Sequence, residues 1–268
     1  MIISHKYKYV FIELSRTASE AISCELCEFY AGERILWKHA SYRDFEKIAG
    51  SKEKKYFIFS GIRNPLDAMI SLYFFHRQDP FKKFGVLKHK FTNLNNYKQF
   101  WFIKNNNVDF LDFFKKFYGS SIYYEWKTKD FDKLNYIYRF ENLQDDFREI
   151  LKRLKIKQVR PLPVINQSFG RRADIYYYFP AEIQGIAGLI SRDYMKKWGY
   201  RFSVDWQQPA SKEWLYYYLF LKPKFFLQTI YHWFFDQSFF YPSIYGGKKN
   251  FISQFYLIYK IWRAKLIK

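Results

Sequence analysis

The chain has 268 residues, 49% of them hydrophobic, which suits one α/β domain with an appendage and leaves no room for a second full catalytic domain. Its net charge of +20 favours anionic partners, although the abundance of Lys, Tyr, Phe, Ile and Asn is equally typical of an AT-rich gene. Two cysteines exclude a disulfide framework, and no His, Asp or Glu cluster has metal-ligand spacing.

Strands and helices alternate at the start of the chain. The pattern predicts strands at 7–13, 34–38 and 56–60, and helices at 20–30, 42–49 and 65–76. Pro65 stands in the first turn of the third helix, where proline is favoured. This alternation implies parallel strands joined by right-handed crossovers.

The rest of the chain is less regular. A basic, aromatic stretch at 79–107 is expected to be a loop-rich insertion. We then expect a helix at 108–118, a strand at 134–140, a helix at 141–154, an irregular loop at 161–172 and a helix at 180–198. Gly199 is the glycine expected just beyond that last helix.

A linker at 207–211 indicates two domains, 1–205 and 206–268. Residues 212–268 contain 20 aromatic residues and 9 Lys and Arg against 2 Asp and Glu, in aromatic stretches at 214–221, 225–235 and 251–267. This mainly helical extension is typical of interfacial membrane helices, but the same aromatic residues would also suit packing on the catalytic domain or on a second subunit.

The N-terminal residues resemble no signal peptide, and no apolar run is long enough to span a membrane. Cys24 and Cys27 have CxxC spacing inside a predicted helix, and we interpret them as packing residues because no second pair follows. We therefore expect a cytoplasmic protein, with peripheral membrane attachment through 212–268 as an open alternative.

Two polar turns, Leu14–Ser19 and Gly61–Pro65, each join a predicted strand to a predicted helix. A parallel sheet binds its ligands at this position, where helix N-termini and turn amides meet the bound group. Arg16 and Arg63 lie in these turns, and a guanidinium matches phosphate geometry. The pair predicts a ligand with two separated phosphates.

Residues 11–19, Phe-Ile-Glu-Leu-Ser-Arg-Thr-Ala-Ser, resemble the 5′-phosphosulfate loop of the carbohydrate-type sulfotransferases that use 3′-phosphoadenosine 5′-phosphosulfate (PAPS). Residues 62–73, Ile-Arg-Asn-Pro-Leu-Asp-Ala-Met-Ile-Ser-Leu-Tyr, are similar to the 3′-phosphate motif of that family. Shorter similarities follow in order at 38–41, 138–143, 162–168 and 192–200. The resemblance, closest to the 2-O-sulfotransferase-like branch, implies a P-loop-like, three-layer α/β fold with a central parallel sheet flanked by helices.

The resemblance also implies which residues bind PAPS. Those for the 5′-phosphosulfate are Arg16, Thr17, Ala18 and Ser19, and those for the 3′-phosphate are Arg63 and Ser71. Arg16 would stabilise charge on the leaving phosphate. Arg16 replaces a usual lysine, and Glu20 and Ala21 stand where Thr and Ser usually supply hydroxyls. Either backbone amides hold the cofactor here, or this branch binds it weakly or differently.

Transfer of a sulfuryl group to a hydroxyl needs a general base, and His39 follows the second predicted strand in a context similar to the family's base histidine. Glu13, Glu20 and Glu25 are weaker alternatives. No metal is required.

We therefore expect a sulfotransferase acting on a glycan or glycolipid. The aromatic and basic region 81–102 would suit a sugar acceptor, and Asn166, Ser168, Arg171 and Arg172 would either line a ligand mouth or form a solvated loop. The alternative is a catalytically silent glycan- or nucleotide-binding protein with the same fold. A kinase is disfavoured because no G-x-x-x-x-G-K-[ST] sequence occurs, and no nucleic-acid-binding module is recognisable.

Overall fold

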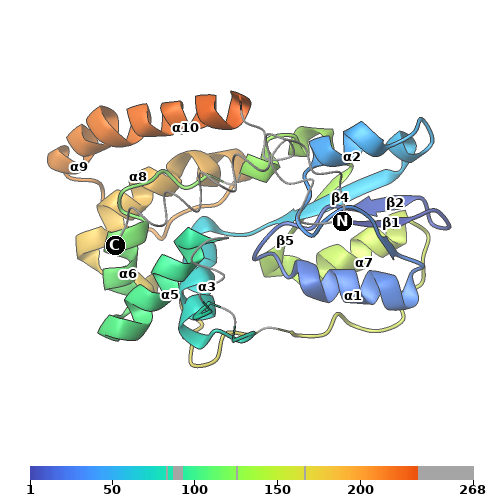
Figure 1. Cartoon of the computed structure of the whole chain (residues 1–268), viewed down its shortest axis with the longest axis horizontal. Coiled ribbons are helices and arrows are strands. Elements are labelled where there is room, and N and C mark those ends of the chain that lie inside the picture. The colour runs from blue at the N-terminus through green and yellow to red at the C-terminus, as the bar shows by residue number, and fades with distance from the viewer. Residues whose placement is uncertain (83, 87–92, 125, 166, 235–268) are drawn as a thin grey trace. The chain divides into compact units, whose positions relative to one another are not determined.

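The computed structural model describes residues 1–82, 84–86, 93–124, 126–165 and 167–234 (Figure 1). The protein is α/β, as predicted, and its chain divides into two compact units. The first contains Met1–Asn64 and Glu125–Gln167, and the second contains Pro65–Tyr124 and the described residues from Ser168 onward. The predicted domains 1–205 and 206–268 remain a prediction.

The first unit is built on a mixed five-stranded sheet of order β3-β1-β2-β4-β5. Its strands are β1 (Ile2–Ser4), β2 (Tyr9–Phe11), β3 (Glu33–Arg34), β4 (Phe57–Ile62) and β5 (Tyr136–Arg139). β2, β4 and β5 are parallel, whereas β1 is antiparallel to both β2 and β3. The expectation of an all-parallel sheet is therefore wrong at one edge, because a short turn joins β1 to β2 and a short turn can join only antiparallel neighbours.

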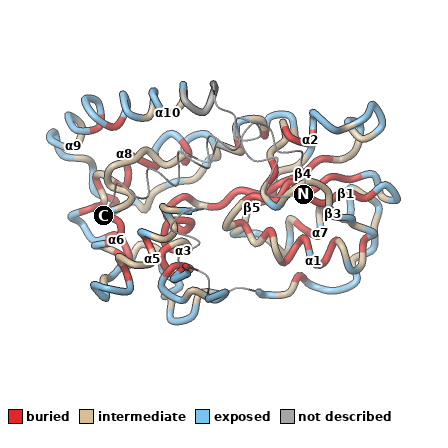
Figure 2. The backbone as a smooth tube through the Cα atoms, in the orientation of Figure 1, coloured by how far each residue is buried: buried red, intermediate tan, exposed pale blue. Residues whose placement is uncertain are grey.

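Helices cover both faces of this sheet (Figure 1). α1 (Ser19–Phe29) and α7 (Leu143–Arg153) share one face, and α2 (Tyr42–Ile48) lies on the other. Side chains alternate along β2 in the way that this arrangement requires, since Tyr9 and Phe11 pack with α1 and α7 while Val10 packs toward α2. Figure 2 accordingly shows β1 and β2 as buried.

The second unit is helical. Its helices are α3 (Pro65–Gln78), α5 (Leu94–Asn106), α6 (Phe110–Phe117), α8 (Ala181–Trp198), α9 (Ser211–Tyr216), a π-helical turn (Tyr217–Leu221) and α10 (Lys222–Phe234). Its core is rich in aromatic side chains, and Trp206, Tyr217 and Leu221 belong to it. α8 ends as predicted, with Gly199 in the left-handed conformation at φ 66°.

Short 3₁₀ turns complete the two units, at Glu53–Lys55, Trp126–Thr128, Phe131–Lys133, Phe140–Asn142 and Tyr176–Tyr178.

The region expected to be a loop-rich insertion contains the helix α5, so that expectation is wrong for 94–106. The Asn93 side chain accepts a hydrogen bond from the backbone N–H of Asn96 and caps the start of the helix. Asn107 adopts a left-handed conformation at its end. The asparagines at 93–96 and 105–107 therefore lie at the two ends of a helix.

No helix among the described residues is both long enough and apolar enough to cross a membrane. The predicted aromatic stretch at 251–267 lies outside the described residues.

Candidate anion-binding site

Three parallel strands of the first unit, β2, β4 and β5, end at one edge of the sheet. The pairing of β2 with β4 continues to Ile12, whose N–H donates to the Phe59 carbonyl at 2.9 Å. The hydroxyl of Ser60 donates to the Ile12 carbonyl at 2.7 Å. The turn that follows β2 therefore starts from a rigid point, at the edge where parallel sheets bind ligands.

The turn Leu14–Ser19 has an unusual backbone. Arg16 and Ala18 are both left-handed, with φ of 67° and 59°, a conformation that costs a non-glycine residue about 1 kcal/mol or more. α1 begins at Ser19, and no side chain caps its start. The positive end of the helix dipole and the amide groups of the first helical turn lie beside this turn, as in known anion sites.

Buried hydrogen bonds hold the turn in this shape. Thr17 is 1% exposed, and its hydroxyl donates to the Leu14 carbonyl at 2.9 Å. The Tyr138 hydroxyl, from β5, donates to the Thr17 carbonyl at 2.9 Å. Burial raises the pKa of the Tyr138 phenol, which therefore stays a proton donor. The Thr17 hydroxyl thus bonds within the turn, so a ligand role for Thr17 would use its backbone N–H.

Gly61 on β4 makes room for this tyrosine. A Cβ atom at position 61 would overlap the Tyr138 ring. The glycine therefore allows the ring to lie across β4 and reach the turn.

Arg63 connects the two turns that the sequence singled out. Its side chain is 7% exposed, and Nη1 donates to the Arg16 carbonyl at 2.8 Å. Its guanidinium lies over the Phe140 ring, 3.8 Å from the ring centre. Beside it, the N–H of Asn64 donates to Oε1 of Glu141 at 2.6 Å. Arg63 is thus fixed against the turn at the ends of β4 and β5.

His39 lies in a left-handed conformation, φ 65°, before α2. Its Nδ1 is 2.9 Å from the Glu13 carbonyl, at the start of the same turn. Because a carbonyl only accepts, Nδ1 carries the proton and Nε2 keeps its lone pair. Burial lowers the pKa of the imidazole to about 4 against the effect of this hydrogen bond, and the charges of Lys127 and Lys38 act in the same direction as burial.

Glu20, the unexpected carboxylate in the first turn of α1, forms an ion pair with Lys38. Lys38 directly precedes His39 in the sequence. The charge that would repel a phosphate at this helix end is therefore balanced by a cation from the neighbouring loop.

Glu13 is fully buried and accepts hydrogen bonds from the Met1 ammonium group and from the Ser23 hydroxyl, the latter at 2.7 Å. Burial alone would raise the pKa of Glu13, but these two hydrogen bonds hold it below its ordinary value.

Glu25 is also buried and pairs with Arg160 at 3.0 Å. The alternative bases Glu13, Glu20 and Glu25 are thus each engaged by a cation.

Ser71, the second predicted 3′-phosphate residue, is 8% exposed on α3. Ser71 belongs to the second unit, whereas Arg63 belongs to the first. The role of Ser71 in binding the 3′-phosphate remains a prediction. Of the predicted mouth residues, Arg171 pairs with Asp67, and Asn166 lies outside the described residues.

Sequence reasoning missed two supporting residues, Tyr138 and Lys38. Both lie in short segments that resemble the sulfotransferase family, 138–143 and 38–41, and this resemblance is the only feature of the sequence that points to them. Neither could be given a role, because their partners, Thr17 and Glu20, lie far away in the sequence.

In the part of the chain that the structure describes, no group of three or more His, Cys, Asp and Glu side chains is arranged to hold a metal ion. Cys24 and Cys27 are free thiols on α1, and burial raises the pKa of Cys27. A raised pKa disfavours the reactive thiolate.

Comparisons of this chain with protein-family models, with curated proteins and with solved structures find no match.

Proposed function

We propose that this protein transfers a sulfuryl group from PAPS to a hydroxyl of a glycan or glycolipid. The observation that supports it best is the hydrogen bond from Arg63 to the Arg16 carbonyl. It joins the two segments that resemble the 5′-phosphosulfate loop and the 3′-phosphate motif of one sulfotransferase family. The finer fold implied by that resemblance, P-loop-like with a C-terminal extension, belongs to the same proposal.

The turn at the start of α1 would bind the 5′-phosphate end of PAPS, which supplies the sulfuryl group. Backbone N–H groups of Thr17, Ala18 and Ser19 would donate to it, and Arg16 would stabilise the negative charge on the leaving oxygen. Arg63 would bind the 3′-phosphate, and the resemblance implies the same ligand for Ser71. A guanidinium has five N–H donors, so this role is compatible with its bond to the Arg16 carbonyl.

His39 would act as the general base through Nε2. The acceptor oxygen forms its bond to sulfur as the bond from sulfur to the leaving phosphate oxygen breaks, and that oxygen takes the electron pair. The acceptor proton passes to Nε2. An imidazole whose pKa is about 4 is neutral at pH 7 and ready to accept a proton, although it is a weak base.

A catalytically silent glycan- or nucleotide-binding protein is the second candidate. It is favoured by the low pKa of His39 and by Glu20 and Ala21, which replace the usual hydroxyl residues.

The first test of both candidates is calorimetry with 3′-phosphoadenosine 5′-phosphate (PAP), the product that PAPS leaves after transfer. Binding at micromolar concentration is expected, and its absence at high micromolar PAP would reject both the sulfotransferase and the nucleotide-binding alternative.

Transfer of radiolabelled sulfate from PAPS to a panel of glycans then separates enzyme from silent binder. We expect His39→Ala to keep PAP affinity and to lose transfer by about a hundredfold or more. Normal transfer by this variant would reject the base assignment, and the absence of transfer by the unmodified chain would favour the silent binder.

We also propose that residues 212–234 attach the protein to an anionic membrane surface. α9, the π-helical turn and α10 pack on the second unit through Trp214, Tyr217 and Leu221. Other apolar side chains on these helices point to solvent, among them Leu219 and Phe226, which are 58% and 64% exposed. Exposed lysines on the same helices, Lys212, Lys222 and Lys224, would meet acidic lipid headgroups.

A further inference from the structure

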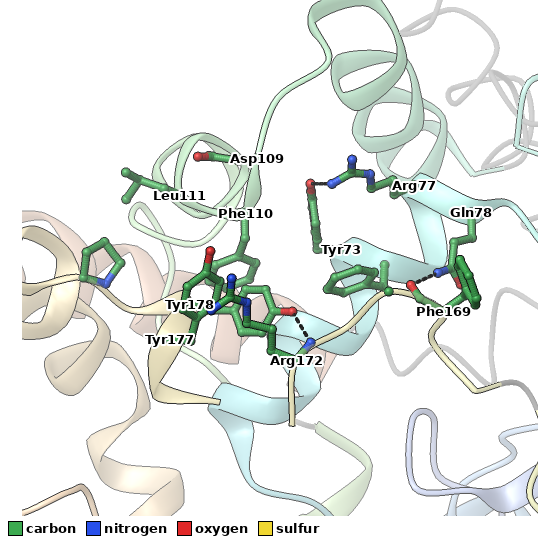
Figure 3. A pocket seen from close by; sticks show the side chains of 13 residues that line it. Tyr73, Arg77, Gln78, Asp109, Phe110, Leu111, Phe169, Arg172, Tyr177 and Tyr178 are labelled. Carbon is green, nitrogen blue, oxygen red and sulfur yellow. Dashed lines mark hydrogen bonds between the residues drawn. The ribbon is translucent and has the colours of Figure 1, made fainter. Parts of the chain in front are cut away.

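The second unit contains an open cavity of about 680 Å³, formed by α3, the start of α6 and the loop before α8 (Figure 3). Its size falls in the range of small-molecule sites. None of the residues to which the sulfotransferase resemblance assigns PAPS binding or catalysis lines it.

Two guanidinium groups line this cavity, and a tyrosine orients each of them. Nη1 of Arg77 donates to the Tyr73 hydroxyl at 2.8 Å. Arg172 lies over the Tyr177 ring, 3.8 Å from the ring centre. Among the described residues, no carboxylate forms an ion pair with either arginine. Each of these two guanidinium groups therefore has further N–H donors available for an anionic group of a ligand.

The rest of the lining combines aromatic surfaces with polar acceptors. Phe169 and Tyr177 line the cavity and are 89% and 53% exposed, so the Phe169 ring and the part of the Tyr177 ring that Arg172 leaves uncovered offer apolar surface to a ligand. Oδ1 of Asp109 caps α6 by accepting the Asp112 N–H at 3.0 Å, and its carboxylate keeps further acceptor positions for a ligand hydroxyl. A ligand that suits this lining has an apolar face, a hydroxyl-bearing edge and a negative group.

We propose that this cavity binds an acidic sugar, a saccharide of about two rings that carries a carboxylate or a sulfate group. The C–H faces of the sugar rings lie on the aromatic rings of Phe169 and Tyr177. The anionic group of the sugar binds Arg77 and Arg172, and a sugar hydroxyl donates a hydrogen bond to Asp109. The carboxylate of Asp109 disfavours a ligand with several phosphate charges. Sugar binding in this cavity goes beyond the proposed transfer of a sulfuryl group and does not depend on it, because no residue proposed for that transfer lines the cavity.

The test is binding of defined disaccharides to the full chain without nucleotide, measured by calorimetry or ligand-observed NMR. The probes are glucuronic acid linked to N-acetylglucosamine, the same disaccharide with its carboxylate methyl-esterified, and the esterified form carrying one sulfate. We expect an acidic probe to bind at least about tenfold more tightly than the neutral ester, because a charge-assisted contact is lost in the ester. The carboxylated and sulfated probes show which anionic group is preferred.

Arg77→Gln and Arg172→Gln should each weaken binding of the preferred probe by about tenfold. Arg153→Gln is the matched control, because Arg153 is also exposed and lies over a tyrosine ring, at 4.8 Å, but does not line the cavity. Equal affinity for all three probes, or unchanged binding by both cavity variants, would overturn the proposal. Binding of adenosine 5′-monophosphate that depends on Arg77 and Arg172 would overturn it in favour of a nucleotide site.

PAP binding is measured on the same variants. A circular dichroism melt shows whether each variant is folded, because Arg77 and Arg172 lie in the second unit and the turn proposed to bind PAP lies in the first. Sugar binding without PAP binding would support this cavity and reject the sulfotransferase proposal. PAP binding without sugar binding would reject only the cavity proposal.

Discussion

The chemistry proposed for His39 depends on a balance between burial and ligand charge. Burial holds the pKa of its imidazole at about 4 in the protein without nucleotide. A bound phosphate beside the imidazole would favour the charged form and raise this pKa toward neutrality, where a general base is most effective. Cofactor binding would then activate the base as well as supply the sulfuryl group.

The expected result is an upward shift of the His39 pKa when PAP is added. Titration of the imidazole C–H signals by NMR measures it, and loss of one signal in His39→Gln assigns that signal. The transfer rate should rise with pH through the pKa of the complex and then level off, since only the neutral imidazole accepts a proton. A midpoint that PAP does not move would contradict the electrostatic link between His39 and the turn.

The pairing of Glu20 with Lys38 explains how a carboxylate is tolerated in the first turn of α1. Lys38→Gln should lower PAP affinity, by about tenfold, because it leaves the Glu20 charge uncompensated near the anion. The double variant Lys38→Gln, Glu20→Gln should recover most of that loss. Calorimetry on both variants and on Glu20→Gln alone completes the cycle. If the double variant binds no better than the single lysine variant, Lys38 acts on the ligand directly.

At the scale of single residues, the sequence singles out Arg16 and Arg63 as candidates, but it does not predict their partners. Arg16 and Arg63 could be singled out because each follows an apolar strand, and the structure brings the Arg63 guanidinium to the Arg16 carbonyl. The bond from Tyr138 to Thr17 spans 121 positions, and no local pattern indicates such a contact.

Element type followed from local patterns wherever a segment was long and periodic. α1, α3 and α8 are examples, since apolar spacing and the flanking Pro65 and Gly199 mark them. The three-residue strand β1 is too short for such a pattern, and its pairing with β2 depends on a turn in which Lys8 adopts φ 56°. The asparagines at the two ends of α5 do not by themselves predict a helix, because asparagine favours turns and helix ends alike.

The packing of β4 against β5 gives a prediction about Gly61. Gly61→Ala would push the added Cβ into the Tyr138 ring. The ring would have to move, which costs about 1–3 kcal/mol of unfolding free energy and withdraws the tyrosine hydroxyl from the turn. Urea unfolding should therefore show lower stability, and calorimetry should show weaker PAP binding.

Gly119→Ala is the control, because a Cβ there meets only ordinary contacts, the nearest at 3.4 Å. If Gly61→Ala binds PAP and unfolds like this control, Tyr138 does not hold the turn in shape.

The division of the whole molecule was hard to read from sequence, because each unit is assembled from separate segments. β5 returns to the first unit after a long excursion and pairs with β4. The predicted linker at 207–211 indicates a boundary near 205, and Trp206, Tyr217 and Leu221 lie in the core of the second unit. Truncation near 205 would therefore remove core side chains along with the aromatic extension.

Membrane attachment is better tested by substitutions on the exposed face of the full chain. The double variant Leu219→Glu, Phe226→Glu places charges on two solvent-facing positions and spares the buried Tyr217 and Leu221. This variant should abolish flotation with vesicles of one part phosphatidylserine to two parts phosphatidylcholine. It removes two apolar side chains, each of which contributes about 1.5–3 kcal/mol to the free energy of membrane binding, and the new carboxylates are repelled by the anionic headgroups.

The matched control is Val164→Glu, Val204→Glu, which makes the same charge change at two residues that are 78% and 101% exposed and lie outside these helices. The unmodified chain and this control should float with the anionic vesicles. They should float less in high salt, because screening weakens the attraction between lysines and headgroups. If both double variants float equally well, this helical face does not contact the membrane, and the excess of lysine and arginine alone accounts for attachment.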